Sequence, residues 1–315
     1  MIGSPLRVAF AGLAHSHPYT DAANARAMGA EIIGVHDADA AATDEFAVRF
    51  GGATVTSVAE LAMLEPDLVI ATPHPHEVVP FLRDLGEAEA PVFMNKVSAA
   101  TPAQLVEVER AVSASAVPIG TASVLRFAPA LRALAADIAG DEVLGLRVLA
   151  QHDNTTFRSP NRLWQDDPQR GGGTLVTVGV HAWEMIDVLL PGAVLAARSG
   201  WTRTRSGSTT ASEDAAGIDG LLRAPGAEFD VPVQVLVTGV PGAHAYTVDV
   251  VTSAGIRSIA LDVDVDDANE ALGFRGLIGA LLDATPQGST VAPWNEARVV
   301  VANCIRAAEI ARGDV

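Results

Sequence analysis

The sequence predicts an α/β protein in which an N-terminal doubly wound (Rossmann) parallel sheet precedes a C-terminal α+β domain with a large, mainly antiparallel sheet. Over roughly the first 120 residues, short apolar runs alternate with helical stretches, a pattern that requires parallel strands joined by right-handed crossovers. Beyond residue 122 the expected strands are longer and are joined by turns. The length of 315 residues fits two domains, which we place at 1–122 and 123–315.

The elements of the first domain follow from its apolar runs in chain order. Thr101 and Pro102 provide an N-cap and a first-turn proline for the last helix. The expected strands are 6–11, 31–37, 54–56, 67–71, 91–95 and 117–120; the expected helices are 18–28, a stretch ending at 50, 58–64, 78–85 and 102–113. Ligands of doubly wound sheets bind beyond the carboxyl ends of the strands, so these ends are the place to search for function.

The second domain is expected to hold six strands and four helices. A small, polar segment from Ser206 to Ala216 predicts a loop between two of the strands. The expected strands are 143–151, 194–204, 217–222, 233–238, 245–251 and 256–261; the expected helices are 129–138, 175–190, 273–282 and 295–312.

Composition excludes several classes of partner. The chain has 21 basic and 38 acidic residues, a net charge of −17, so nothing would offset the repulsion from nucleic acid or an anionic membrane surface. Cys304, the single cysteine, forms no internal disulfide, which fits a reducing compartment. No apolar run approaches the roughly 20 residues that span a bilayer. We therefore expect a cytoplasmic protein with a small-molecule substrate.

Lys96 is the one lysine in a chain otherwise rich in arginine, alanine, valine and glycine. Such a composition indicates a coding bias that replaces dispensable lysines, so a retained lysine favours a need for its compact, deprotonatable ammonium. Chance is the alternative explanation. Lys96 follows the expected strand that ends at Asn95, where it could hydrogen-bond a substrate hydroxyl or move its proton.

The turn after the first strand resembles a degraded dinucleotide fingerprint. Of the three glycine positions only Gly12 is kept, and Ala14 and His17 occupy the other two. Asp37 ends the next strand, 25 residues after Gly12. An acid at this place accepts hydrogen bonds from an adenosine ribose and disfavours a 2′-phosphate, which predicts NAD rather than NADP. The alternative is a solvated carboxylate at a strand end.

Five of the eight histidines fall at the expected carboxyl ends of strands in the first domain: His15, His17, His36, His74 and His76. The fold would gather them at one sheet edge, where we expect them to donate hydrogen bonds to the phosphates or ribose of a cofactor. Two His-x-His pairs on neighbouring strands could instead hold zinc or iron, since imidazole suits both metals. Loop histidines in water are the third alternative.

A glycine run in the second domain leads into a further candidate. Residues 170–181 read Arg-Gly-Gly-Gly-Thr-Leu-Val-Thr-Val-Gly-Val-His, and a helix here would set Thr177 and His181 on one face. His181 has suitable chemistry for a general base near neutral pH. A structural helix histidine is the alternative.

Taken in order, these segments resemble the Gfo/Idh/MocA family of NAD(P)-dependent oxidoreductases over nearly the whole chain. The matching segments are Ala71-Thr72-Pro73, Lys96, Arg126-Phe127-Ala128-Pro129, the run from Gly171 to His181, and 273–312. The resemblance implies hydride transfer between a nicotinamide and a sugar- or polyol-like substrate, with Lys96 and His181 as catalytic residues. It also implies a homodimer or homotetramer built on the uncovered face of the second sheet.

The expected binding residues follow from the motifs and the resemblance together. For the cofactor they are Gly12, Ala14, His15, His17, Asp37, Thr72, Pro73, His76, Asn95 and Lys96. For the substrate they are Arg126, Asp153, Trp164, Arg170 and Thr177.

The chain departs from the family pattern at its catalytic positions. Asn95 and Val97 replace the glutamate and proline that flank the family lysine, and Thr177 replaces a carboxylate four residues before the histidine. Either Asp153 or Glu184 takes over as the acid partner, or the chemistry differs. The alternatives are an epimerase or glycosidase that uses NAD transiently, a binding or regulatory protein without catalysis, and a metal-dependent enzyme that uses the paired histidines.

Overall fold

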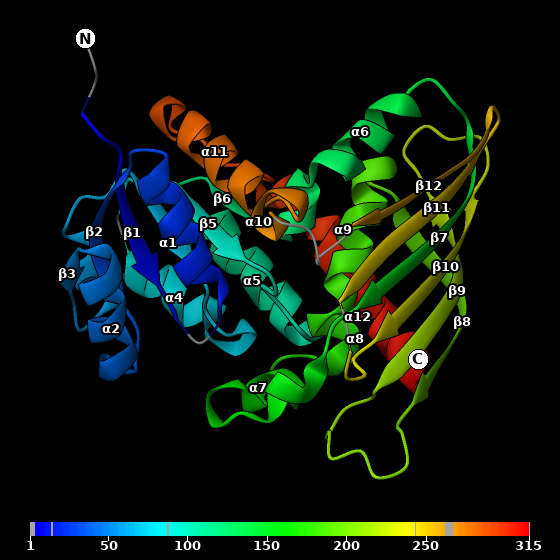
Figure 1. Cartoon of the computed structure of the whole chain (residues 1–315), viewed down its shortest axis with the longest axis horizontal. Coiled ribbons are helices and arrows are strands. Elements are labelled where there is room, and N and C mark those ends of the chain that lie inside the picture. The colour runs from blue at the N-terminus through cyan, green and yellow to red at the C-terminus, as the bar shows by residue number, and fades with distance from the viewer. Residues whose placement is uncertain (1–3, 14, 87, 243, 262–266, 315) are drawn as a thin grey trace. The chain divides into compact units, whose positions relative to one another are not determined.

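The computed structural model describes residues 4–13, 15–86, 88–242, 244–261 and 267–314. The chain divides into two compact units (Figure 1). The first contains Met1–Ala99, Ala103–Ala122 and Phe274–Ala297, and the second contains Ala100–Pro102, Ser123–Gly273 and Arg298–Val315.

A six-stranded parallel sheet forms the centre of the first unit, with strand order β3-β2-β1-β4-β5-β6. This is the doubly wound order, so the predicted fold class of the N-terminal part is confirmed. The strands are β1 (Arg7–Ala11), β2 (Glu31–His36), β3 (Ala53–Thr54), β4 (Leu68–Ala71), β5 (Val92–Asn95) and β6 (Ile119–Ala122). The helices between them are α1 (His17–Ala27), α2 (Ala40–Phe50), α3 (Val58–Ala62), α4 (Val78–Leu85), preceded by the 3-10 turn η1 (Pro75–Glu77), and α5 (Pro102–Ala114).

Local sequence explains these elements. The central strands β4 and β5 are buried along their whole length, which is why they read as continuous apolar runs. Asp39 caps α2 by accepting hydrogen bonds from two backbone N–H groups of its first turn, and Ser57 caps α3. Phe10 of β1 packs against Phe46 of α2, with ring centroids 5.2 Å apart, and so fixes that helix on the sheet.

The segment Phe274–Ala297, predicted from the sequence to lie in the second domain, belongs to the first unit. Its helix α11 (Phe274–Ala284) packs against α1, as Figure 1 shows. Further along, Gly120 of β6 forms an antiparallel bridge with Pro293. Contacts between residues so distant in sequence leave no local signal, so a boundary drawn from local pattern does not reveal them.

The second unit is built on a six-stranded mixed sheet of order β12-β11-β7-β10-β9-β8. All its neighbouring strands are antiparallel except β7 and β10, so the predicted large, mainly antiparallel sheet is confirmed. The strands are β7 (Val143–Gln151), β8 (Val194–Arg203), β9 (Ala215–Arg223), β10 (Val231–Thr238), β11 (Ala245–Thr252) and β12 (Gly255–Leu261).

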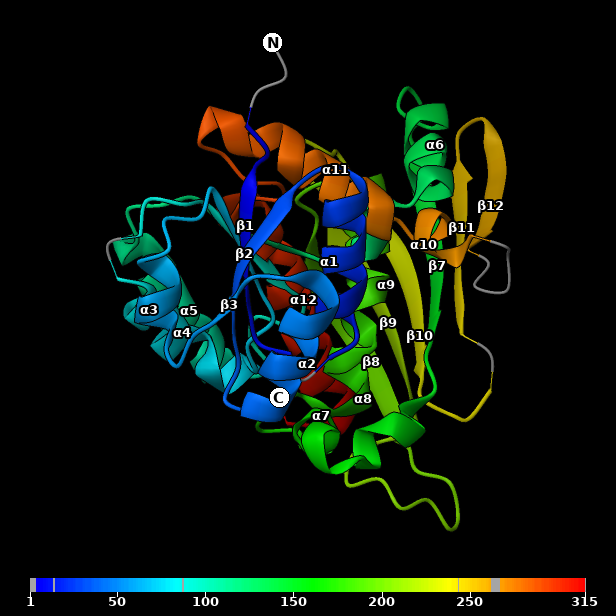
Figure 2. The ribbon, with the colours of Figure 1, turned by 60° about the vertical axis from the view of Figure 1, so that its left-hand side comes forward.

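One face of this sheet is covered by helices, as Figure 2 shows for α9. Along β10, buried and exposed side chains alternate, which is the pattern of a sheet with one packed face. The helices and helical turns are η2 (Val124–Phe127), α6 (Pro129–Asp137), η3 (Asn154–Arg158), η4 (Pro160–Arg162), α7 (Leu163–Asp166), α8 (Gly173–Thr177), α9 (Gly179–Leu189) and α10 (Ala268–Ala271), with η5 (Thr285–Gln287) in the first unit and α12 (Trp294–Arg312). Within the described ranges, no helix has the length and apolarity needed to cross a membrane.

Candidate active site

A pocket of about 290 Å³ lies at the carboxyl edge of the first sheet. Four of the predicted cofactor residues line it: Gly12, Asp37, Thr72 and Pro73. They come from the ends of β1, β2 and β4, three neighbouring strands. Among the described residues, the lining includes three carboxylates and neither lysine nor arginine.

Gly12 lets two strand ends approach each other closely. Its φ is +85°, and a Cβ atom built there would lie 2.4 Å from the backbone oxygen of Thr72. Its N–H donates to the backbone oxygen of His36 at 2.9 Å. Asp37 is held next to the same turn, because its Oδ2 accepts a hydrogen bond from the N–H of Leu13 at 2.5 Å. Gly12 is thus the one fingerprint glycine present in the sequence, and this close packing requires it.

We expect Gly12→Ala to distort this pocket. The added methyl group must displace the Thr72 carbonyl as well as adopt a left-handed backbone, so unfolding stability should fall by roughly 2–4 kcal/mol in a urea titration. Gly29→Ala is the matched control, because Gly29 has a φ of +90° but no atom within 4 Å of the built Cβ. Equal losses in the two variants would show that backbone strain alone accounts for the effect.

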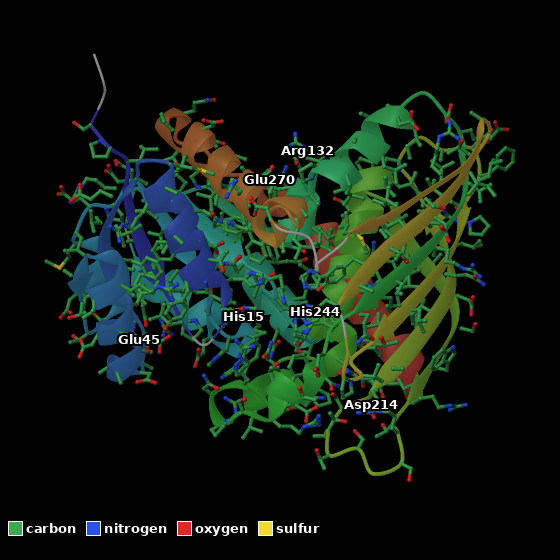
Figure 3. The ribbon with its side chains drawn as sticks, viewed as in Figure 1. His15, Glu45, Arg132, Asp214, His244 and Glu270 are labelled. Atoms are coloured by element: carbon green, nitrogen blue, oxygen red, sulfur yellow. The ribbon has the colours of Figure 1, made fainter. Side chains whose placement is uncertain are left out.

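His15, His17 and His76, which are predicted to bind the cofactor, do not line the pocket of the first sheet and have contacts elsewhere. The ring of His17 is buried and packs edge-on against His15, at 4.3 Å, and against Phe274 of α11, at 5.0 Å. His15, labelled in Figure 3, also accepts a hydrogen bond from the His17 N–H at 3.3 Å. Neither ring, nor that of His76, is part of the pocket lining. Ala14 lies outside the described residues, so the roles of this loop toward a cofactor stay predictions.

His74, His76 and Glu77 form a group that could hold a metal ion. Their ligand atoms all lie within 4.8 Å of one another, and His74 Nδ1 is 2.9 Å from Glu77 Oε2. This hydrogen bond is the main reason why the pKa of Glu77 is lowered. Two imidazoles and a carboxylate suit zinc or iron. His15 and His17 are not members of this group. The group therefore does not join the two His-x-His motifs in the way that the sequence predicts.

A buried polar network lies beside Lys96. Nδ2 of Asn95, at the end of β5, donates to Oδ2 of Asp21 on α1 at 3.0 Å and to Oγ1 of Thr72 at 3.1 Å. Asp21 is fully buried, and this burial raises its pKa to about 7 even though the bond from Asn95 opposes the shift. The next residue, Lys96, is also buried. Sequence reasoning missed Asp21, because one acid within a helical stretch carries no motif.

In the second unit, the glycine run precedes α8, and Thr177 ends that helix. Oγ1 of Thr177 donates to the backbone oxygen of Gly171 at 3.1 Å, so its hydroxyl fastens the glycine turn. The single helix predicted over 175–190 is wrong: it is broken at Val178, and His181 lies in the first turn of α9. The β-branched residues and the glycine around the break are weak helix formers, which explains the interruption.

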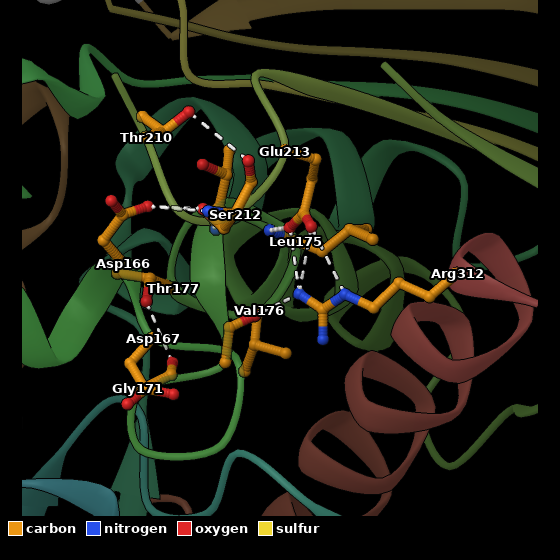
Figure 4. Close-up of polar contacts among 12 residues, drawn as sticks. Asp166, Asp167, Gly171, Leu175, Val176, Thr177, Thr210, Ser212, Glu213 and Arg312 are labelled. Carbon is orange, nitrogen blue, oxygen red and sulfur yellow. Dashed lines mark hydrogen bonds and ion pairs between the residues drawn. The ribbon is translucent and has the colours of Figure 1, made fainter. Parts of the chain in front are cut away.

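Figure 4 shows the polar contacts that hold this turn. Glu213 Oε1 accepts from the N–H of Leu175 at 2.7 Å and from Nη2 of Arg312 at 3.0 Å. The same nitrogen of Arg312 donates to the backbone oxygen of Gly172 at 2.6 Å. A Cβ at Gly173 would lie 2.9 Å from that nitrogen. The glycines therefore leave room for a buried ion pair.

Oγ of Ser123 lies 2.6 Å from Nδ1 of His181, and both side chains are buried. Ser123 precedes η2, and its backbone N–H donates to Oε2 of Glu184 at 2.8 Å. Tyr246 of β11 packs edge-on against the imidazole, with centroids 5.3 Å apart. Ser123 thus lies between His181 and Glu184, and these two residues are one turn apart on α9.

Arg126 joins two buried carboxylates in the same region. Its Nε donates to Glu184 Oε1 and its Nη2 to Asp187 Oδ2. Burial raises the pKa of Glu184, and the charge of Arg126 opposes this rise. Two carboxylates, Glu184 and Asp153, are predicted to replace the acid at position 177. Glu184 binds Arg126, whereas Asp153 accepts a hydrogen bond from the N–H of Thr155 at 2.8 Å.

The remaining predicted substrate residues lie in and around α7. Trp164 is buried in that helix, and Arg170 is exposed in the turn before the glycine run. Sequence reasoning missed a stacked pair, His152 and His244, with ring centroids 4.0 Å apart (His244 is labelled in Figure 3). They follow β7 and precede β11, so attention to the strand ends of the second sheet would have found them.

The fold matches solved structures, although no protein-family model and no curated protein matches the sequence. GenD2 from gentamicin A biosynthesis, solved with NAD, has a TM-score of 0.82 at 19% identity, covering 100% of this chain and 96% of that one. Myo-inositol 2-dehydrogenase from Lactobacillus plantarum gives 0.78 at 12%, covering 98% of each chain. An inositol dehydrogenase homologue from Azotobacter vinelandii, complexed with NAD+, gives 0.74 at 16%, covering 98% and 96%. This chain therefore has the fold of the Gfo/Idh/MocA-type oxidoreductases.

Proposed function

We propose that the protein is an NAD-dependent oxidoreductase that transfers a hydride between the nicotinamide and a sugar- or polyol-like substrate. The observation that carries the proposal is the pocket at the carboxyl edge of the first sheet, which gathers Gly12, Asp37 and Thr72 at the place where doubly wound folds bind nucleotides. The inositol dehydrogenases of like fold support a polyol substrate.

The pocket residues fit the adenosine end of NAD. Gly12 lines the pocket, and the carboxylate of Asp37 can accept hydrogen bonds from ribose hydroxyls. Asp37, Glu77 and Asp84 all line the pocket, with no described lysine or arginine among the lining residues. Such an environment repels a 2′-phosphate, which favours NAD over NADP. The eleven-residue helix α1 begins next to this edge, and its N-terminus would attract the pyrophosphate.

When bound, NAD or NADH would accept or donate the hydride, and the chain must supply the remaining functions. One group has to polarise the substrate oxygen, and one has to take or give its proton. Lys96, buried after β5, and His181, buried in α9, are our candidates for these tasks. The polar residues at the same end of the second sheet as Tyr246, including His152 and His244, are candidates for substrate hydroxyl contacts.

We also propose that copies of the chain assemble through the outer face of the second sheet, as a homodimer or homotetramer. Trp201 of β8 is 41% exposed, and Leu236 of β10, a strand whose alternate side chains are buried, is 39% exposed. Exposed apolar side chains on an uncovered sheet face favour burial against another copy.

NADH titration tests the proposal directly, with Asp37→Asn as the informative variant. Loss of a charge-assisted hydrogen bond to ribose should weaken NADH binding by about 10- to 100-fold, as measured by nicotinamide fluorescence. Asp84→Asn, another carboxylate of the pocket, is the matched control and should bind NADH as the wild type does.

Wild-type protein that binds no NADH at millimolar concentration would refute the proposed cofactor. Equal affinities in the wild type and Asp37→Asn would refute the assignment of this carboxylate to the ribose. If NADH binds but no substrate yields net NADH, the transient use of NAD by an epimerase or glycosidase becomes the better explanation.

A further inference from the structure

We propose that Ser123 holds His181 as the neutral tautomer protonated at Nε2, so that this histidine presents a hydrogen-bond donor, and not a base, to the substrate. The tautomer follows from the geometry of the second unit alone. Its use on a substrate oxygen rests on the proposed function. Ser123 is thereby a positioning residue for the imidazole.

The hydrogen-bonding capacity of the serine decides the tautomer. Oγ of Ser123 accepts a hydrogen bond from the N–H of Leu125 at 3.2 Å, and the Ser123 side chain is 0% exposed. The hydroxyl hydrogen therefore needs an acceptor inside the protein. In the part of the chain that the structure describes, that acceptor is Nδ1 of His181, at 2.6 Å. A neutral imidazole that accepts at Nδ1 carries its proton at Nε2.

The opposite arrangement is disfavoured. If Nδ1 of His181 donated to Ser123, the serine oxygen would accept two hydrogen bonds and its own hydrogen would stay buried without a partner. Leaving a buried hydroxyl unpaired disfavours that state by about 10- to 100-fold.

The position of Ser123 beside His181 is restrained, because the backbone of the serine is also held by a hydrogen bond. Its N–H donates to Oε2 of Glu184 at 2.8 Å, and the other oxygen of this carboxylate accepts from Nε of Arg126. The two oxygens of Glu184 therefore accept hydrogen bonds from the backbone of Ser123 and from Arg126. Glu184 influences His181 by fixing the position of Ser123.

A carboxylate partner would have the reverse effect. A carboxylate accepts only, so it forces the proton onto Nδ1 and leaves Nε2 as a base. Position 177, where the family pattern has that acid, holds a threonine whose hydroxyl bonds to Gly171. With Ser123 as partner, His181 can polarise a substrate oxygen but does not take its proton at Nε2.

The tautomer can be read from the nitrogen NMR signals of protein labelled with ¹⁵N-histidine, with His181→Gln used to assign the ring. We expect Nδ1 to show the shift of an unprotonated nitrogen and Nε2 that of a protonated one. A protonated Nδ1 in the neutral ring would overturn the proposal. This measurement needs neither cofactor nor substrate, so its outcome is independent of the proposed function.

Variants of the serine give the second readout. Ser123→Ala should lose the preference and show a mixture of tautomers, whereas Ser123→Thr, which keeps the hydroxyl, should restore it. Ser212→Ala is the control, because Ser212 is a buried serine of the same unit whose hydroxyl donates to Oδ1 of Asp166 at 2.7 Å. This variant should leave the His181 signals unchanged. An unaltered tautomer in Ser123→Ala would refute the role of the hydroxyl.

Discussion

Asp21→Asn should make the protein more stable at pH 8 and change its stability little at pH 4. In the folded protein, burial raises the pKa of Asp21 to about 7, whereas in the unfolded chain it titrates near its usual 3.8. Between these values the folded state binds more protons, so the free energy of unfolding falls as the pH rises through this window. Three pH units correspond to a loss on the order of 4 kcal/mol, complete above pH 7.

The asparagine variant avoids this loss, because it stays neutral and keeps an oxygen for the Asn95 amide. The quantity to measure is the difference in unfolding free energy between variant and wild type, from urea titrations at several pH values. Asp84→Asn, which removes an exposed carboxylate, should give a small difference that varies little with pH. If the Asp21→Asn difference is equally flat, the carboxyl does not titrate in this window.

Arg126→Met should strongly destabilise the second unit. The arginine neutralises Glu184, which is 1% exposed, and Asp187, which is 9% exposed. Its loss leaves two buried carboxylates close together without a cation. Breaking a buried ion pair from one side costs about 3–5 kcal/mol, so many molecules should be unfolded at physiological temperature.

Arg223→Met provides the matched comparison. Arg223 makes two hydrogen bonds to Asp230, but its side chain is 74% exposed, so water screens the pair. Its removal should lower stability far less than Arg126→Met does in the same thermal or urea unfolding experiment. Similar losses for the two variants would mean that the Arg126 cluster is as well solvated as a surface pair.

Much of the fold could be predicted from local pattern. The helix over 78–85 and the strand over 143–151 agree with α4 and β7 in both bounds, since each has a strong period and clear ends. The short α7 was missed, because four residues provide no period to detect. The placement of Phe274–Ala297 in the first unit was missed for another reason: its contacts with α1 and β6 are tertiary.

Some residues of the candidate site could be predicted from the sequence, and others could not. Gly12, Asp37, Thr72 and Pro73 could be named from sequence, because strand ends of a doubly wound sheet meet at one edge. The bond between Ser123 and His181 could not, since the two residues are 58 positions apart and a single serine has no motif. Strand-end reasoning finds residues on one sheet edge, whereas partners that meet through packing of a turn on a helix require the structure.

The clamp formed by Glu213, Arg312 and the glycine run has an evolutionary consequence. One guanidinium fills the space that a side chain at position 173 would need, and it binds both the Glu213 carboxylate and the Gly172 carbonyl. Losing Glu213 or Arg312 leaves the partner charge unpaired, and a larger residue at position 173 clashes with the guanidinium. Descendants of this chain should therefore inherit the three together or replace them together, which makes their joint variation a marker by which true close kin can be told from merely similar folds.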